Sequence, residues 1–439
     1  MDFKWGVSTA AYQVEGGWNA DGKGQSIWDV FANTKGKIYK NQNGNTACDF
    51  YHRYTHDLAI MHQLNIPNFR FSISWSRILP NGTGAVNLKG IDFYNRVIDF
   101  CLELGIEPWI TIYHWDLPYE LEKKGGWTNR EIIRWFGDYV EVCIKYFGDR
   151  VKRWIILNEP MAFTGAGYFL GLHAPGRKGL NSFLSATHHA AMCQAEGGRI
   201  VRSMSSEASV GTVFSSTLVQ PFVDNKQDAL AAMRIDALLN RLFVEPLAGL
   251  GYPVKDFKLL QRLEVFIKDG DECKLNFDMD FIGLQHYTRE IVTSSLLTPL
   301  LWAKIIPADK RFVERTDMNW EVYPQSIYEM LLKFSKYTHF KEIIVTENGA
   351  AFPDVMVNGK VNDIKRIHYL DQHIDQVFRA RKDGVNVNGY FAWSLTDNFE
   401  WKEGYRPRFG LVFIDFETQK RIIKDSGYWY SQRIRGTLI

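Results

Sequence analysis

Eight short apolar runs, separated by stretches with helical periodicity, constrain the fold of this chain more than any other feature of its sequence. Nearly continuous apolar runs are typical of parallel strands that are buried on both faces. We therefore predict eight parallel strands, at FKWGVSTAAYQ (3–13), NFRFSISW (68–75), PWITIYHW (108–115), RWIILNE (153–159), SVGTVFSS (209–216), DFIGLQHY (280–287), EIIVTEN (342–348) and GYFAWSL (389–395).

The stretches between these runs predict amphipathic helices. Apolar residues recur there at spacings of three or four, as in 50–64, 91–104 and 132–147. Strands that alternate with helices indicate the α/β class and, for eight strands, a (β/α)8 TIM barrel. A doubly wound open sheet is the alternative, but no Gly-rich phosphate loop supports it.

The length of the chain predicts long βα loops. The chain has 439 residues, whereas this fold typically needs ~250. We expect the excess in four loops, at 14–48, 160–183, 288–322 and 396–420. No long Gly/Ser/Pro linker divides the chain, so residues 1–439 are expected to form a single catalytic domain.

Composition excludes several classes of partner. The net charge of +2 at pH 7 gives no indication of nucleic acid or an anionic membrane surface. The most apolar span, residues 291–307, is interrupted by polar side chains, so no transmembrane helix is expected. The five cysteines are scattered without a C-x-x-C motif, which disfavours a disulfide framework or a zinc site. With no signal-peptide pattern, we expect a cytoplasmic protein.

Polar residues at the ends of the runs predict where the active site lies. In a barrel of this type the site is built at the C-terminal ends of the strands. Residues that end different runs therefore point at one pocket, however far apart they lie in the sequence. The residues in question are Gln13, His114, Trp115, Glu159, Tyr287, Glu347 and Trp393.

Two of these residues, Glu159 in IILNEP and Glu347 in IIVTENG, indicate a chemistry. Hydrolysis of a glycosidic bond needs one carboxylic acid to protonate the leaving oxygen and one carboxylate on the other side of the anomeric carbon. Alternatively, each glutamate could cap a helix or pair with an arginine. Because both follow an apolar run and both stand next to an asparagine, we favour the catalytic pair.

Motifs along the whole chain resemble those of glycoside hydrolase family 1, the retaining β-glucosidase family. They occur in the order of that family: FKWGVSTAAYQVEGGWNADGKGQSIWDVF, ACDFYHRYTHDLAIM, FRFSISWSRILP, YHWDLP, LNEP, GLHAPG, VTENG and WSLTDNFEW. The resemblance implies a (β/α)8 barrel that removes terminal non-reducing β-D-glucosyl residues. The reaction would be a double displacement through a covalent glycosyl-enzyme.

The resemblance also implies a role for individual residues. Glu159 matches the acid/base and Glu347 the nucleophile, which Arg70 and Tyr287 would hold. The implied substrate contacts are Asn158 for the 2-hydroxyl, Gln13, His114, Glu400 and Trp401 for the other glycone hydroxyls, Trp393 beneath the sugar, Trp320 on the aglycone side and Phe409 at the far wall. Trp393 as a plain core residue and Arg70 as a structural ion pair remain the alternatives.

Electrostatics agrees with these roles. A cation at Arg70 lowers the pKa of Glu347 and keeps the nucleophile ionised. Glu159 must stay protonated, which an apolar wall and the negative charge of Glu347 favour. In a retaining enzyme the two carboxyl groups are expected to lie about 5–5.5 Å apart.

The substrate is less constrained than the reaction. Gln13 and Glu400 can bind either orientation of the 4-hydroxyl, so glucose, galactose and fucose all stay open. No metal or organic cofactor is expected, because two carboxylates suffice; the partner is a small-molecule β-glycoside, and the oligomeric state is open. One alternative is a 6-phospho-β-glycosidase, although Glu400 would repel a phosphate. The other is a catalytically weak sugar-binding member, although both catalytic glutamates are present.

Two departures from the family pattern leave the aglycone open. The family usually has Trp after NEP, where this chain has Met161. The sixth run usually ends in Asn-Tyr-Tyr, where this chain has Gln285, His286 and Tyr287. The tyrosine is kept, so contacts made by its neighbours are the ones expected to differ.

Overall fold

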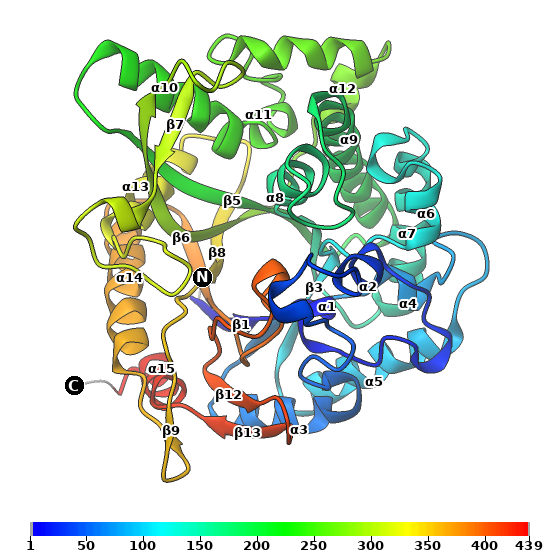
Figure 1. The fold of residues 1–439 in the computed structure, drawn as a ribbon. Coiled ribbons are helices and arrows are strands. Elements are labelled where there is room, and N and C mark those ends of the chain that lie inside the picture. Colours follow the sequence, from blue (N-terminus) through cyan, green and yellow to red (C-terminus); the bar gives the residue numbers. More distant parts are fainter. Residues whose placement is uncertain (1–2, 438–439) are drawn as a thin grey trace.

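The computed structural model describes residues 3–437, and at its centre eight parallel strands close into a barrel (Figure 1). Hydrogen bonds join them in the order β1-β2-β3-β4-β5-β6-β8-β11, and β11 pairs with β1 to close the ring. This confirms the predicted (β/α)8 TIM barrel. The strands are β1 (Lys4–Ser8), β2 (Asn68–Ser72), β3 (Glu107–Tyr113), β4 (Arg153–Asn158), β5 (Ser209–Pro221), β6 (Phe281–Ser294), β8 (Glu342–Asn348) and β11 (Val387–Trp393).

Large apolar side chains fill the inside of the barrel, as the fold requires. Trp109 of β3 packs against Phe281 of β6 and Phe391 of β11, with ring centroids 5.5 and 5.0 Å apart. These strands lie on different sides of the barrel, so their aromatic side chains meet near the barrel axis. Six strands each contribute one fully buried residue to this cluster: Trp109, Ile155, Val213, Phe281, Ile344 and Phe391.

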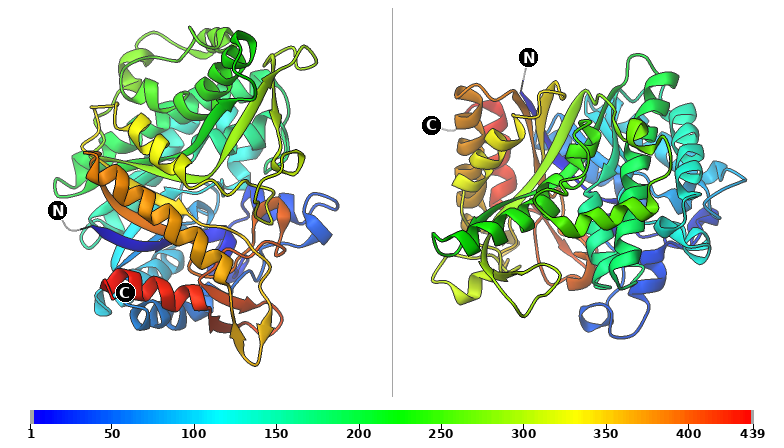
Figure 2. Two further views of the ribbon diagram at one scale, coloured as in Figure 1. Left: turned by 90° about the vertical axis from the view of Figure 1, so that its left-hand side faces the viewer. Right: turned by 90° about the horizontal axis from the view of Figure 1, so that it is seen from above.

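Helices surround the strands, and Figure 2 shows α14 (orange) beside α15 (red) on the outer surface. The predicted helices at 50–64, 91–104 and 132–147 are present as α3, α5 and α7. Among residues 3–437, no helix is both long enough and apolar enough to cross a membrane. The longer helices are α3 (Phe50–Gln63), α5 (Leu88–Glu103), α7 (Ile132–Phe147), α9 (Leu180–Met204), α10 (Lys226–Asp236), α13 (Gln325–Phe334), α14 (Ile364–Lys382) and α15 (Asp425–Arg435).

All four expected loops hold short elements. The first contains α2 (Ile27–Ala32), the second α8 (Pro160–Thr164), and the last β12 (Val412–Asp415). The helical turn α1 (Ala11–Val14) lies almost entirely within the run predicted as a strand. The strand predicted at 3–13 is too long: β1 ends at Ser8, and α1 turns the chain inward. The Ala11 N–H donates to Ser72 Oγ at 2.7 Å, which fixes this turn against the end of β2. Gln13 therefore reaches the top of the barrel from a helical turn.

The loop expected at 288–322 begins as sheet instead. Strands β5 and β6 continue past the barrel, and Leu218–Pro221 pairs with Arg289–Val292. The short strand β7 (Ala303–Ile306) then pairs antiparallel with the end of β6. The runs predicted at 209–216 and 280–287 are therefore too short, because the ladder continues wherever two neighbouring segments keep pairing, whether or not both of their faces are buried. This extension forms one wall of the cavity described next.

Candidate active site

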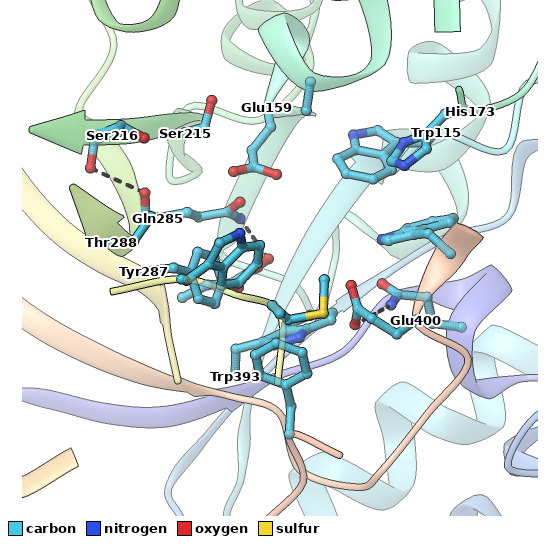
Figure 3. A pocket seen from close by; sticks show the side chains of 18 of the residues that line it. Trp115, Glu159, His173, Ser215, Ser216, Gln285, Tyr287, Thr288, Trp393 and Glu400 are labelled. Atoms are coloured by element: carbon cyan, nitrogen blue, oxygen red, sulfur yellow. Dashed lines mark hydrogen bonds between the residues drawn. The ribbon is translucent and has the colours of Figure 1, made fainter. Parts of the chain in front are cut away.

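Glu159 and Glu347 line one cavity at the C-terminal ends of the strands. Glu347 stands one residue before the end of β8, and Glu159 directly follows β4. The Glu159 N–H donates to the carbonyl of Val213 at 2.9 Å, which holds the residue over the neighbouring strand. The cavity has a volume of about 330 Å³. In Figure 3 the Glu159 carboxylate points into it from above, opposite Trp393.

Nearly all of the predicted site residues line this cavity. Arg70 and Asn158 do not, because both are fully buried behind it. Within residues 3–437, no group of three or more His, Cys, Asp or Glu side chains is placed to hold a metal ion. The predicted residues that line the cavity are Gln13, His114, Trp115, Glu159, Tyr287, Trp320, Glu347, Trp393, Glu400, Trp401 and Phe409.

Three residues that line this cavity have a strained backbone. Trp115, Glu159 and Trp401 have φ angles of 80°, 42° and 47°. Positive φ is uncommon for residues other than glycine and is costly for bulky ones. Such residues persist only where the surrounding structure enforces them, and they cluster at functional sites.

Arg70 joins β8, which carries Glu347, to β4, which ends next to Glu159. Its Nη1 donates to Glu347 Oε1, and its Nη2 donates to Asn158 Oδ1 at 2.5 Å. The amide nitrogen of Asn158 lies 2.9 Å from His114 Nε2. Arg70 thus forms an ion pair with the predicted nucleophile, and the side-chain oxygen and nitrogen of Asn158 both have protein partners.

Two further donors hold the Glu347 carboxylate. Tyr287 Oη donates to Oε2 at 2.6 Å, which is the contact that the family resemblance implied. Gln285 Nε2 donates to Oε1 at 2.5 Å and to Asn158 Oδ1 at 2.6 Å. The sequence marked Gln285 only as a departure from a family pattern, and its contact with Glu347 was missed.

The two carboxyl groups have different electrostatic surroundings. Burial and the negative charge of Glu347 raise the pKa of Glu159 well above its usual range. Burial also raises the pKa of Glu347, but Arg70 and the Tyr287 hydrogen bond oppose it. Arg70 thus lowers the pKa of Glu347, as expected, but the opposing effect of burial is larger. The arrangement favours a proton on Glu159 and a charge on Glu347.

Several residues that line this cavity carry a buried polar atom with no hydrogen-bond partner in residues 3–437. A buried polar atom without a hydrogen bond costs free energy, so each indicates a missing partner such as a ligand hydroxyl. Nearby, Glu400 accepts from Gln13 Nε2 at 3.4 Å, and burial raises the pKa of Glu400 to about 8. The unpartnered atoms on residues that line the cavity are Gln13 Oε1, His114 Nδ1, His173 Nδ1 and Gln285 Oε1.

Aromatic rings form the rest of the cavity wall. Trp401 packs on Trp115 with ring centroids 4.5 Å apart, and Trp320 packs on Tyr287 at 5.1 Å. Trp393 lines the cavity and also packs in a small buried cluster with Phe409, so it is both a core residue and a cavity residue. Flat rings beside unpartnered polar atoms suit a ligand that has apolar faces and polar edges.

Sequence reasoning missed a second group of cavity residues. His173 stands in the GLHAPG motif, to which no role had been given. Ser215, Ser216 and Gln285 lie within two of the predicted strands, and the others lie in the expected loops or, for Thr217, just beyond a predicted strand. Conversely, Met161 and His286, two of the positions that depart from the family pattern, do not line the cavity. The missed residues are Ala162, His173, Ser215, Ser216, Thr217, Gln285, Thr288, Glu290, Met318 and Lys402.

Comparison with known proteins agrees with this geometry. The model of Glycosyl hydrolase family 1 matches residues 1–437. The 1,4-beta-D-glucan glucohydrolase of Thermotoga neapolitana is 45% identical, over 99% of this chain and 97% of that protein. Beta-glucosidase A of Thermotoga maritima is 44% identical, with the same shares covered. The solved structure of a beta-glucosidase from Thermotoga maritima in complex with glucoimidazole has a TM-score of 0.95 at 42% identity and covers 100% of this chain and 98% of its own.

Proposed function

Because the chain belongs to glycosyl hydrolase family 1 and is therefore a glycoside hydrolase, we propose that it is a retaining β-glucosidase that removes terminal β-D-glucosyl residues. One observation carries the proposal. Glu159 and Glu347 line the same cavity, and their surroundings favour a proton on one and a charge on the other. A pair of carboxyl groups in different protonation states is what a glycosidase needs.

In the proposed reaction, Glu347 attacks the anomeric carbon while Glu159 protonates the leaving oxygen. The glycosyl-enzyme that forms is then hydrolysed by a water molecule that Glu159 deprotonates. Arg70 and Tyr287 keep Glu347 oriented and ionised for the attack. Glu347 is thus the nucleophile of the first step and water that of the second, while Glu159 transfers the proton in both.

The glycone would lie over Trp393, between Glu400 and the catalytic pair. Gln13 Oε1 and His114 Nδ1 are free to bind its hydroxyls, and the Glu400 carboxylate can accept from two of them. We propose glucose as this sugar, since the relatives named above are glucosidases or a glucohydrolase. The amide nitrogen of Asn158 has two hydrogens and one protein partner, His114 Nε2, so its second hydrogen is the one left to donate to the 2-hydroxyl.

The first test is the configuration of the first product. Two inversions at one carbon restore the starting configuration, so proton NMR in the first minutes of hydrolysis of an aryl β-glucoside should show β-glucose before α-glucose. An aryl α-glucoside is the matched control and should stay intact. Early appearance of the α anomer would contradict the double displacement.

The pH profile should report the two carboxyl groups. Protonation of Glu347 removes the nucleophile at low pH, and ionisation of Glu159 removes the acid at high pH, so kcat/KM should be bell-shaped. Because both pKa values are raised, both limbs should lie above the usual carboxyl pKa of about 4.3. With an activated substrate, Glu159→Gln should lose the alkaline limb. If the limb disappears instead in Glu400→Gln, Glu400 is the group that titrates.

A change at Glu400 tests the alternative function, that of a 6-phospho-β-glycosidase. Glu400→Ser removes an acceptor for the outer hydroxyls, so kcat/KM for an aryl β-glucoside should fall at least ~10-fold. The same change removes a negative charge that repels phosphate, so the ratio of 6-phosphoglucoside to glucoside turnover should rise. A wild-type enzyme that prefers the phosphorylated substrate would contradict the proposed specificity.

We also propose a reducing, cytoplasmic compartment. All five cysteines are free thiols, and Cys48, Cys101, Cys143 and Cys193 are buried. Free buried thiols are common in proteins of reducing compartments.

A further inference from the structure

Three of the residues expected to contact the glycone lie on one loop. Glu400, Trp401 and Phe409 all line the cavity, and all follow β11 in the chain. We call residues 397–410 the glycone loop. In Figure 3 Glu400 lies across the cavity from Ser215, on the side where the glycone is proposed to bind. Side chains on a loop are placed less firmly than side chains on a barrel strand, so their positions depend on what holds the loop.

The carboxylate of Asp397 closes the glycone loop at its base. Its Oδ1 accepts from the Gly410 N–H at 3.0 Å, so the first and last residues of the loop are joined. Its Oδ2 accepts from Arg408 Nη1 at 2.6 Å, which adds a second bond within the loop. The side chain of Asp397 is fully buried. One buried carboxylate therefore fixes the spacing between the two ends of the loop.

Lys424 holds this carboxylate from outside the loop. It lies directly after β13 (Lys420–Ile423) and before α15, and it is fully buried. Its Nζ donates to Asp397 Oδ1 at 2.6 Å and to Asp354 Oδ2 at 2.5 Å. Asp354 belongs to the segment that follows β8, the strand that carries Glu347. Lys424 thus joins the glycone loop to the segment after the strand of the proposed nucleophile.

The cluster around Lys424 contains equal numbers of positive and negative side chains. Burial alone would raise the pKa of Asp397, but the positive charges nearby, of which that of Lys424 has the largest effect, lower it below its usual value. Burial lowers the pKa of Lys424, and its two aspartate partners oppose this. Removing one partner of a buried ion pair leaves an uncompensated charge, so each member depends on the others. Ion pairs join all six side chains of the cluster, which are Arg366, Arg408, Lys424, Asp354, Asp363 and Asp397.

We infer that Lys424 is a positioning residue for glycone recognition, because through Asp397 it holds the glycone loop, and with it Glu400, where the sugar binds. This inference rests on the proposed function. Lys424 does not line the cavity, so it can act on the sugar only through the loop. The segment that follows the last barrel strand then takes part in the choice of sugar as well as in the stability of the fold.

A purely stabilising role is the alternative, and another contact of α15 offers a comparison for it. The Ser426 hydroxyl donates to Asp363 Oδ2 at 2.5 Å, and its N–H donates to Asp363 Oδ1 at 2.8 Å. Ser426 is as buried as Lys424 and stands two residues after it, but its bonds lead to the N-terminus of α14 instead of the glycone loop. A change at Ser426 therefore tests the stability of the same region without removing a contact of Asp397.

The experiment uses the double variant Lys424→Met/Asp354→Asn, which removes one charge of each sign and so keeps the cluster neutral. The quantity measured is the ratio of kcat/KM for 4-nitrophenyl β-glucoside to kcat/KM for 4-nitrophenyl β-xyloside. Xylose lacks the hydroxymethyl group and offers one outer hydroxyl fewer to Glu400, whereas the catalytic steps are shared. We expect the ratio to fall at least ~10-fold, as for loss of a hydrogen bond to a charged group. Ser426→Ala is the control: its thermal midpoint should fall while its ratio stays within 2-fold of wild type.

A second comparison tests whether the effect passes through the glycone loop. In a Glu400→Ser background the hydrogen bond to the sugar is already absent, so adding the double variant should change the ratio less than 2-fold. Such non-additivity is expected of residues that act through one contact, and a general loss of stability does not produce it. If the double variant is not recovered as folded protein, Lys424→Gln, which keeps a donor without the charge, is measured by the same criteria.

Three results would overturn the inference. They are a ratio within 2-fold of wild type in the Lys424 variant, an equal fall of the ratio when the change is made in the Glu400→Ser background, and an equal fall in Ser426→Ala. Failure of the wild type to cleave either aryl glycoside would instead refute the proposed function.

Discussion

Replacing Glu347 by alanine is expected to abolish turnover of every β-glucoside, whatever its leaving group. In the proposed mechanism Glu347 forms the covalent bond to the sugar, so both good and poor leaving groups depend on it. Loss of a nucleophile that works with other catalytic groups lowers kcat by orders of magnitude, and we expect ~10⁴-fold or more. Steady-state rates with 2,4-dinitrophenyl and methyl β-glucosides should therefore fall together.

Azide shows from which side Glu347 acts. In Glu347→Ala the cavity left by the side chain lies beneath the anomeric carbon, so azide that enters it should attack from that face and give the α-glucosyl azide. Because Arg70 loses its partner in the alanine variant, Glu347→Gln is the control for folding. It should be as inactive as Glu347→Ala with a thermal midpoint closer to wild type. Retention of more than a few per cent of wild-type activity by either variant would refute the assignment.

The barrel and the placement of Glu159 and Glu347 in one cavity could be predicted because each follows from a local pattern and one general rule. Parallel strands buried on both faces leave continuous apolar runs, and these are visible in the sequence. The rule that barrel strands point their C-terminal ends at the site then places Glu159 and Glu347 together. Neither step needs knowledge of how distant side chains pack.

The extension of β5 and β6 could not be predicted in the same way. Residues 217–221 and 288–294 are largely half-buried or exposed, so they lack the continuous apolar pattern of a barrel strand. They form sheet because they pair with each other, which is a tertiary property. The prediction ended both strands too early, and Thr217, Thr288 and Glu290 were therefore not recognised as cavity residues.

The contacts around Glu347 were hidden for a different reason. Gln285 is one methylene longer than the asparagine usual in the family, and whether its amide reaches Glu347 depends on positions within an ångström. Asn158 was expected to contact the substrate because it matches the family residue that binds the 2-hydroxyl. Its bonds to Arg70 and Gln285 could not be predicted for the same reason, and its contact with a substrate stays a prediction.

Replacing Glu159 by alanine is expected to separate substrates by their leaving groups, unlike the change at Glu347. A 2,4-dinitrophenolate departs without a proton, so the glycosyl-enzyme should still form quickly. Its hydrolysis should be slow, because no base activates the water. Stopped-flow measurement should therefore show a burst followed by slow turnover with a low apparent KM. A methyl glucoside, which needs the proton, should lose ~10²–10⁴-fold in rate, the usual contribution of general acid catalysis.

Azide also shows on which face of the sugar Glu159 acts, and the expected glucosyl azide has the opposite configuration to that from Glu347→Ala. Azide needs no base, so in Glu159→Ala it should accelerate breakdown of the glycosyl-enzyme and yield the β-glucosyl azide, because it attacks from the side that Glu159 occupied. The two alanine variants should thus give azides of opposite configuration, which NMR distinguishes directly. One mobile carboxylate serving both steps cannot give that pair of results, since its removal would leave only one face open. If both variants gave the same azide, or if azide did nothing for Glu159→Ala, the separate roles of Glu159 and Glu347 would be untenable.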